Sequence, residues 1–207
     1  MTSIEFWYEF ASPYSALSAL RIAREAEAAG VAVQWCPFLL GPIFRSQGWQ
    51  GSPIMAVPEK GAHMWRDLER HGNALGVPMN CPNPFPQNGL VASRVALVAI
   101  DEGWCAEFTR AVYRAEFTEL KTIAERPVIA HIIAGLGRDP AAVLSRAESE
   151  DNKQRLRAQT EQAKQRGIFG APSFVAPDGE LFWGNDRLAE ALHWACHGSL
   201  EGLLRPV

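Results

Sequence analysis

The chain has 207 residues, and 47% of them are hydrophobic, which is enough to bury one sizeable core. Its 20 Lys and Arg against 23 Asp and Glu give a formal net charge of −3, without the basic stripe that nucleic-acid binding requires. Because Glu5 and Glu9 stand where a signal peptide carries lysines, and no apolar run approaches the roughly 18 residues of a membrane span, we expect a cytoplasmic protein with neither nucleic-acid nor membrane partners.

The first elements predict a β-α-β unit. The apolar run over residues 4–10 favours a strand, and Ser12 followed by Pro13 favours a helix start, because Ser is a preferred N-cap and Pro fits the first helical position. Gly30 favours the end of that helix, and the β-branched and aromatic run over 31–40 favours a second strand. A crossover of this kind predicts two parallel strands in one sheet.

The middle of the chain predicts helices. Gly and Pro punctuate residues 41–58, which favours a long loop with one helical turn. Between 59 and 167 the apolar clusters recur at helical spacing, with an extended Pro-rich linker at 82–86 and a helix start at Asp139. The polar stretch 148–166 favours a helix with one wide solvated face, or alternatively a partner surface.

The last elements predict a hairpin and a helix. Residues 173–176 and 180–183 favour two strands joined by a tight Pro-Asp-Gly turn. The amphipathic helix over 188–194 would be capped by Asn185 or Asp186.

Taken in chain order, these elements predict an α/β protein with thioredoxin-like β-α-β and β-β-α halves and an all-helical domain inserted between them. We expect the thioredoxin-like domain to comprise residues 1–41 and 165–207. The helical insertion domain would then comprise residues 42–164.

The cysteines and histidines carry no predicted chemistry. The cysteines are widely spaced without a CxxC pair, and we interpret them as buried or surface thiols: Cys36, Cys81, Cys105 and Cys196. His193 and His197 lie one helical turn apart, but HExxH is absent and no third ligand is evident, so no metal site is predicted.

Two short motifs carry the predicted chemistry. Ser12 presents an exposed hydroxyl beside a helix N-terminus, at the corner where thioredoxin-like folds place a CxxC pair. With Ser12 and Ser15 there instead, the corner can hold an anion or a thiolate while the chain supplies no redox sulfur. Pro172 is either an ordinary proline of an edge strand or a cis-proline facing Ser12, which would leave the backbone of Ala171 free to pair with a peptide-like ligand. Because the other elements have the thioredoxin order, we predict the cis form.

These motifs are part of a specific resemblance. From about Ile4 to Leu192 the chain resembles the 2-hydroxychromene-2-carboxylate isomerases and the kappa-class glutathione transferases, a DsbA-like branch of the thioredoxin superfamily. Four runs carry it: FASPYS at 10–15, PFLLG at 37–41, GIFGAP at 167–172 and FWGNDR at 182–187. The resemblance implies that glutathione is the cofactor, that Ser12 hydrogen-bonds to its sulfur, and that the backbone of Ala171, before Pro172, pairs with its cysteinyl unit.

The resemblance also assigns the two charged ends of glutathione. It implies that Asn185 and Asp186 bind the γ-glutamyl end and that Lys60 reaches the glycyl carboxylate. A carboxylate suits an α-ammonium, and a lysine ammonium suits a carboxylate. Without the family, Asp186 is equally a helix cap and Lys60 a solvated loop lysine.

One stretch departs from the kappa pattern. Kappa enzymes carry an asparagine after the loop glycine, where this chain has Gly48 and Trp49, and often an aromatic residue where it has His63. We expect an apolar lid for an aromatic co-substrate here, although such side chains also form core beneath a long loop. The side chains expected to contact the substrate are Tyr14, Phe44, Trp49 and Phe85, with Trp65 beside them in the lid.

The predicted function is a glutathione-dependent isomerase of 2-hydroxychromene-2-carboxylate or a related aromatic-catabolism intermediate, acting by reversible thiolate addition and elimination. Two alternatives stay open: a kappa-like glutathione transferase, which consumes glutathione, and a non-catalytic glutathione- or peptide-binding protein. A disulfide oxidoreductase is not expected, because the corner lacks both cysteines and Cys36 lies on the next strand. The family is commonly dimeric, so the expected partners are a small aromatic substrate and a second copy of the chain.

Overall fold

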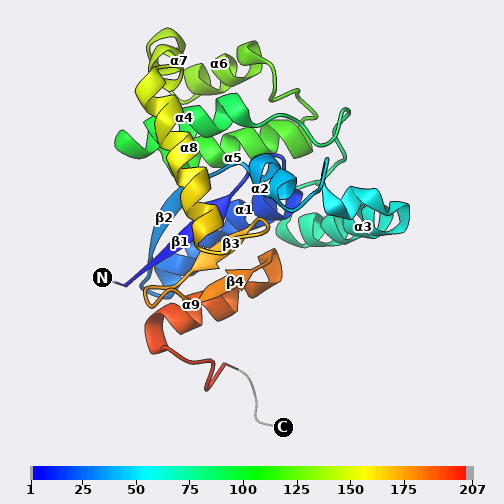
Figure 1. The fold of residues 1–207 in the computed structure, drawn as a ribbon, viewed down its shortest axis with the longest axis vertical. Coiled ribbons are helices and arrows are strands. Elements are labelled where there is room, and N and C mark those ends of the chain that lie inside the picture. Colours follow the sequence, from blue (N-terminus) through cyan, green and yellow to red (C-terminus); the bar gives the residue numbers. More distant parts are fainter. Residues whose placement is uncertain (1, 204–207) are drawn as a thin grey trace.

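A computed structural model describes residues 2–203 and contains one four-stranded sheet (Figure 1). Its strands are β1 (Ser3–Tyr8), β2 (Ala32–Pro37), β3 (Ser173–Val175) and β4 (Leu181–Trp183), in the spatial order β2-β1-β3-β4. β1 and β2 are parallel, whereas β3 is antiparallel to both β1 and β4. The predicted β-α-β unit and the C-terminal hairpin are therefore confirmed.

The crossover helix α1 (Pro13–Ala28) begins and ends where local chemistry favours it. Ser12 is the N-cap in an extended conformation, and Pro13 occupies the first helical position, where it loses no hydrogen bond. Gly30 follows the helix with φ of +69°, a conformation that only glycine adopts readily. Both predicted boundaries of this helix are confirmed.

The segment after β2 is more helical than the expected loop. It contains α2 (Leu40–Ser46) and a 3-10 turn at Pro53–Ala56. Pro42 lies in the first turn of α2, where a missing N–H breaks no intrahelical bond, so its presence did not exclude a helix.

The block that follows is helical, as predicted; in Figure 1 its helices α4 to α7 lie above the sheet, whereas α3 lies to the right of it. The polar stretch forms a long helix as expected, and a π-helical turn interrupts the block at Arg114–Thr118. The helices are α3 (Pro58–Leu75), α4 (Leu90–Asp101), α5 (Cys105–Tyr113), α6 (Arg126–Gly135), α7 (Pro140–Ala147) and α8 (Glu150–Gln165).

Two hydrophobic clusters cover the two faces of the sheet. Phe6 of β1 and Phe174 of β3 belong to a large cluster that also includes side chains of α1, α4, α5 and the last helix, α9 (Leu188–His197). Trp7 and Val175 point to the opposite face and pack with α2 and α8 in a smaller cluster. The large cluster runs from the sheet into α4 and α5, so both predicted domains share one core. The division of the chain into these two domains at 42 and 164 stays a prediction. Residues 204–207 of the predicted thioredoxin-like domain lie outside the described residues.

The predicted cap of α9 is wrong. Asn185 and Asp186 belong to a 3-10 turn, Asn185–Arg187, that leads directly into the helix, and neither side chain caps it. Within residues 2–203, no helix is long and apolar enough to cross a membrane.

Candidate functional site

The Ser12 hydroxyl joins two segments that are far apart in the sequence. Its Oγ accepts a hydrogen bond from the Ser15 N–H at 3.2 Å and donates one to the Ala171 carbonyl at 2.9 Å. The prediction that the Ser12 hydroxyl is exposed is therefore wrong. Ser12 is only 8% exposed, because the loop before β3 packs against it. A hydroxyl with one acceptor and one donor already in place is held in a fixed orientation at the start of α1.

The loop before β3 has the predicted cis bond between Ala171 and Pro172. Gly184 N–H donates to the Pro172 carbonyl at 3.0 Å, and Ser173 Oγ donates to the Gly170 carbonyl at 2.9 Å, so the loop is tied to β4 and to itself. The expected free carbonyl of Ala171 is engaged by Ser12, which corrects the prediction. A carbonyl oxygen has two lone pairs, so it can accept a second hydrogen bond.

Asn185 is an internal anchor. Its side chain is buried, and its Oδ1 accepts hydrogen bonds from Ser18 Oγ at 3.0 Å and from Arg21 Nε at 3.3 Å. Arg21 also donates to the Asn185 backbone carbonyl. These bonds hold the turn that carries Asp186 against α1. Sequence reasoning missed Ser18 and Arg21 as partners of Asn185 because they lie more than 160 residues away in the chain.

Tyr14 interacts with Asp186 and with Asp67, an aspartate that sequence reasoning missed. Tyr14 Oη donates to Asp67 Oδ2 at 2.9 Å. Burial, the hydrogen bond to Asp67 and the charges of Asp67 and Asp186 raise the pKa of Tyr14, so both carboxylates are within electrostatic reach of its ring. The Asp186 side chain is 71% exposed, with Arg187 Nη2 at 3.6 Å.

The side chains expected to form the lid do not form one group. Phe44 is half-buried and packs against the smaller cluster, on the face covered by α2 and α8. Phe85 packs against the large cluster, with its ring 4.9 Å from that of Trp65. Trp49 is 46% exposed and donates its backbone N–H to the Phe44 carbonyl at 2.9 Å.

Lys60 lies in the first turn of α3, directly after the segment that carries Trp49. It is exposed, so its ammonium is available to a ligand at the cost of little desolvation. Trp49 and Lys60 of the 41–60 segment are therefore exposed to solvent, in contrast to Phe44 of the same segment and to the buried hydroxyl of Ser12.

Two buried carboxyl groups lie beside the turn that carries Ser12. The Glu9 carbonyl accepts hydrogen bonds from Ser12 N–H at 3.0 Å and from Tyr113 Oη at 2.9 Å. Burial raises the pKa of the Glu9 carboxyl to about 8, partly offset by the Ala11 N–H. Burial and the charge of Glu9 also raise the pKa of Glu116, whose carboxylate oxygens have no hydrogen-bond partner among the described residues.

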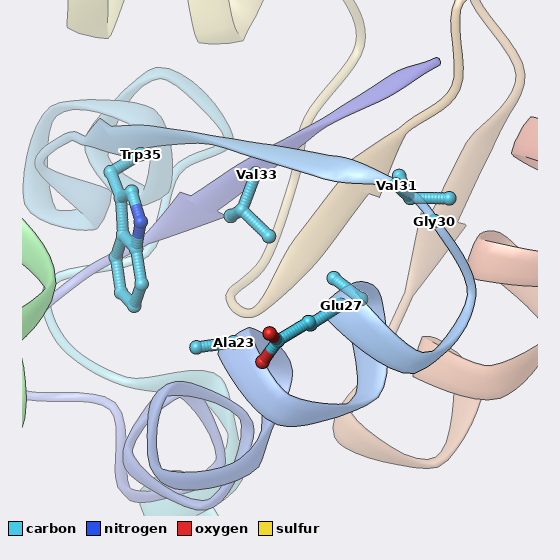
Figure 2. Close-up of a pocket in the computed structure, with 7 residues that line it drawn as sticks. Ala23, Glu27, Gly30, Val31, Val33 and Trp35 are labelled. Atoms are coloured by element: carbon cyan, nitrogen blue, oxygen red, sulfur yellow. The ribbon is translucent and has the colours of Figure 1, made fainter. Parts of the chain in front are cut away.

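The hollow drawn in Figure 2 is separate from this corner. Ala23 and Glu27 line it from α1, and Val33 and Trp35 from β2. Ala23 is 11 residues from Ser12 along a chain that is helical from Pro13, which corresponds to about 16 Å. We therefore place the candidate site at the Ser12 corner, where polar groups from three segments converge.

Comparisons with known proteins agree with this fold. The family model described as a DSBA-like thioredoxin domain matches residues 3–193. The chain is 28% identical over 195 residues to a 2-hydroxychromene-2-carboxylate isomerase of Sphingobium xenophagum, a match covering 90% of this chain and 94% of that protein. It is 26% identical over 211 residues to glutathione S-transferase kappa 1 of Homo sapiens, covering 92% and 89%.

A solved structure gives the same result. A 2-hydroxychromene-2-carboxylate isomerase structure superimposes with a TM-score of 0.84 at 25% identity, covering 95% of this chain and 97% of that chain. The resemblance inferred from the four motifs is therefore confirmed, as is the thioredoxin-like α/β class. The chain belongs to the family of DSBA-like thioredoxin domains.

Proposed function

We propose that this protein is a glutathione-dependent isomerase of 2-hydroxychromene-2-carboxylate or of a related aromatic-catabolism intermediate. One observation carries the proposal: a single hydroxyl, Ser12 Oγ, is fixed at the start of α1 and contacts the Ala171 carbonyl at 2.9 Å. The similarity to isomerases of this name at 28% and 25% identity supports the same conclusion.

The residues of the corner fit glutathione. Ser12 Oγ and the Ala171 carbonyl place a donor for a sulfur and an acceptor for a peptide N–H within 2.9 Å of each other. Asp186, exposed beside Tyr14, would bind the α-ammonium, and the exposed Lys60 would bind the glycyl carboxylate. Asn185 would act through its bonds to Ser18 and Arg21, by holding Asp186 in place.

When bound, glutathione would supply a thiolate that adds to a conjugated double bond of the substrate and leaves again, so that none is consumed. The Ser12 hydroxyl has one proton, which the Ala171 carbonyl now accepts, while the Ser15 N–H occupies one of its lone pairs. By rotating away from Ala171, the Ser12 O–H would donate a hydrogen bond to the sulfur and keep its proton. The released carbonyl would then accept the N–H of the ligand, so the two changes support each other.

The energy required of Ser12 is modest. A free thiol has a pKa of about 8.5. To lower that pKa by one to two units, the protein must stabilise the thiolate relative to the thiol by about 1.4 to 2.7 kcal/mol. A hydroxyl donor and the first-turn N–H groups of α1 supply stabilisation of that size. The thiols of Cys36 and Cys105 are poor substitutes, because burial raises the pKa of Cys36 to about 12 and that of Cys105 to about 11.

A kappa-like transferase is the second candidate, supported by the match to glutathione S-transferase kappa 1 at 26% identity. It would use the same corner, but the conjugate of glutathione and substrate would be released as the product, whereas the isomerase would eliminate glutathione from it. The test measures glutathione binding by calorimetry, then glutathione consumption during turnover of 2-hydroxychromene-2-carboxylate. Turnover with no net consumption supports the isomerase, consumption supports the transferase, and binding without turnover supports a non-catalytic glutathione-binding protein.

A further inference from the structure

Two large aromatic side chains are exposed at the edge of the Ser12 corner. Phe169 lies in the loop before β3 and is 43% exposed, and Trp183 ends β4 and is 53% exposed. Their rings contact each other edge to face, with centroids 4.8 Å apart and planes at 61°. Aromatic side chains bury large areas when covered, so an exposed pair is a favourable surface for another apolar ring.

Gly170 fixes the Trp183 ring in this exposed position. A Cβ added at Gly170 would lie 2.3 Å from Trp183 Nε1 and 2.9 Å from its Cε2, so the indole rests directly on bare backbone. The ring therefore keeps its place through contact with the loop and with Phe169, although about half of it faces solvent. A preorganised ring loses little conformational entropy when a ligand binds.

The pair lies close to the Ser12 hydroxyl. Phe169 is two residues before Ala171, so their Cα atoms are at most about 7.6 Å apart. Trp183 is paired with Ser173 across the hairpin, and Ser173 is two residues after Ala171. Because Ala171 contacts Ser12 directly, the residues that carry both rings flank the backbone group that binds Ser12.

Both rings also lie on one side of the sheet. Side chains two residues apart on a strand share a face, so Trp183 points to the same face as Leu181, which packs against the smaller cluster. Ile168, directly before Phe169, belongs to that cluster, and Phe44 of α2 packs against it. Phe85 packs in the other cluster and does not share this face.

We propose that Phe169 and Trp183 form the subsite for the aromatic ring of the co-substrate and determine specificity for flat bicyclic rings. This inference rests on the proposed function, because it takes the ring to be attached to the group that the sulfur attacks. Gly170 is a positioning residue that acts through Trp183.

The test uses the full chain and 2-naphthoate, an inert bicyclic aromatic acid, as the probe. Its affinity is measured by calorimetry with glutathione at saturation, and glutathione affinity is measured separately. Trp183→Ala and Phe169→Leu should each weaken 2-naphthoate about fivefold or more, whereas Trp183→Phe should retain most of the affinity. Glutathione affinity should stay within about twofold of the original in all three variants.

Gly170→Ala provides a second variant that deletes no ring. The added methyl group displaces the indole, so this variant should weaken 2-naphthoate in the same direction as Trp183→Ala. Gly135→Ala is the matched control, because a Cβ there meets nothing within 4 Å. If Trp183→Ala fails to fold, Gly170→Ala and Phe169→Leu still decide the question.

Unchanged 2-naphthoate affinity in folded variants overturns the inference. A change from dimer to monomer on Trp183→Ala also overturns it, because the pair would then be an interface between copies of the chain. Failure of the original protein to bind glutathione contradicts the proposed function instead. In that case 2-naphthoate is titrated alone, so the ring subsite is still tested by the same variants.

Discussion

The turn after β1 and the segment from 41 to 60 contribute candidate residues of opposite character. Glu9 and Ser12, in the turn, are each 8% exposed, and their polar groups make hydrogen bonds to segments more than 100 residues away. Trp49 and Lys60, in the segment, are exposed, and the Trp49 side chain is 46% accessible.

Burial governs how large an effect the substitution of each residue can have. A buried group at low dielectric changes its protonation state and the stability of the fold, because every partner it loses leaves an unpaired polar atom. An exposed side chain competes with water for its ligand, so its removal changes binding by a smaller amount. We therefore expect the effects of substitution to decrease from the turn to the segment.

The largest effect should come from Glu9 as a change of stability with pH. Burial raises the pKa of its carboxyl from the ordinary 4.5 to about 8 in the folded chain. Between these values the folded state keeps a proton that the unfolded state has lost, so the free energy of unfolding falls as pH rises from about 4.5 to about 8. At 1.36 kcal/mol per unit, the loss is at most about 5 kcal/mol.

Urea unfolding at pH 5 through pH 9 measures this loss. Glu9→Gln should flatten the slope, because an amide does not titrate. Some slope should remain, since burial also raises the pKa of Glu116 and that group acts in the same direction. Equal slopes for Glu9→Gln and the original protein would show that Glu9 ionises in the folded chain without cost.

The next effect should come from Ser12→Ala. We expect at least about a tenfold loss of turnover, equivalent to about 1.4 kcal/mol, and a raised pKa of the bound thiol, with the fold retained. Ser93→Ala is the matched control, because the buried Ser93 Oγ, on α4, has no hydrogen-bond partner among the described residues. Thiolate absorbance against pH measures the thiol. If turnover and the pKa of the bound thiol are both unchanged in Ser12→Ala, the proposed role of Ser12 is wrong.

Sequence patterns predicted the turn better than the segment because its signals are local. Ser12 and Pro13 are adjacent, and both act within the first helical turn, so their role as helix start could be predicted from residue type alone. Pro172 could be predicted as cis because the order of the elements placed it opposite Ser12.

The remaining features depend on contacts between distant segments. Asn185 did not cap α9, because its amide oxygen is taken by Ser18 and Arg21 from α1. Asp67 was missed because its hydroxyl partner, Tyr14, lies 53 residues earlier. A polar residue with a satisfied partner far away in sequence leaves no periodic or local signal.

Lys60→Ala should have a moderate effect on glutathione alone. An exposed ammonium that binds a carboxylate contributes about 0.2 to 1 kcal/mol, which predicts a rise in the apparent Michael constant of a fewfold. The rise should shrink as salt increases, because exposed charges are screened. Lys164, on α8, gives a control substitution of the same type. A Michael constant that does not depend on Lys60 would remove this residue from the glycyl end.

Trp49→Ala should have the smallest effect, and on the aromatic substrate only. An indole has one N–H and no acceptor, so Trp49 cannot bind a carboxylate as an amide side chain does. It is also 46% exposed and tied to Phe44 through its backbone, so its ring contributes through partial coverage of the substrate and not through a fixed contact. We therefore expect a rise of about two- to threefold in the Michael constant of the aromatic substrate, with glutathione affinity unchanged.

Trp49→Phe is the control and should bring the Michael constant most of the way back to the original value, since it keeps an apolar ring. If Trp49→Ala weakens glutathione and leaves the aromatic substrate untouched, the segment belongs to the glutathione site and the departure at Gly48 and Trp49 changed how the glycyl end is bound.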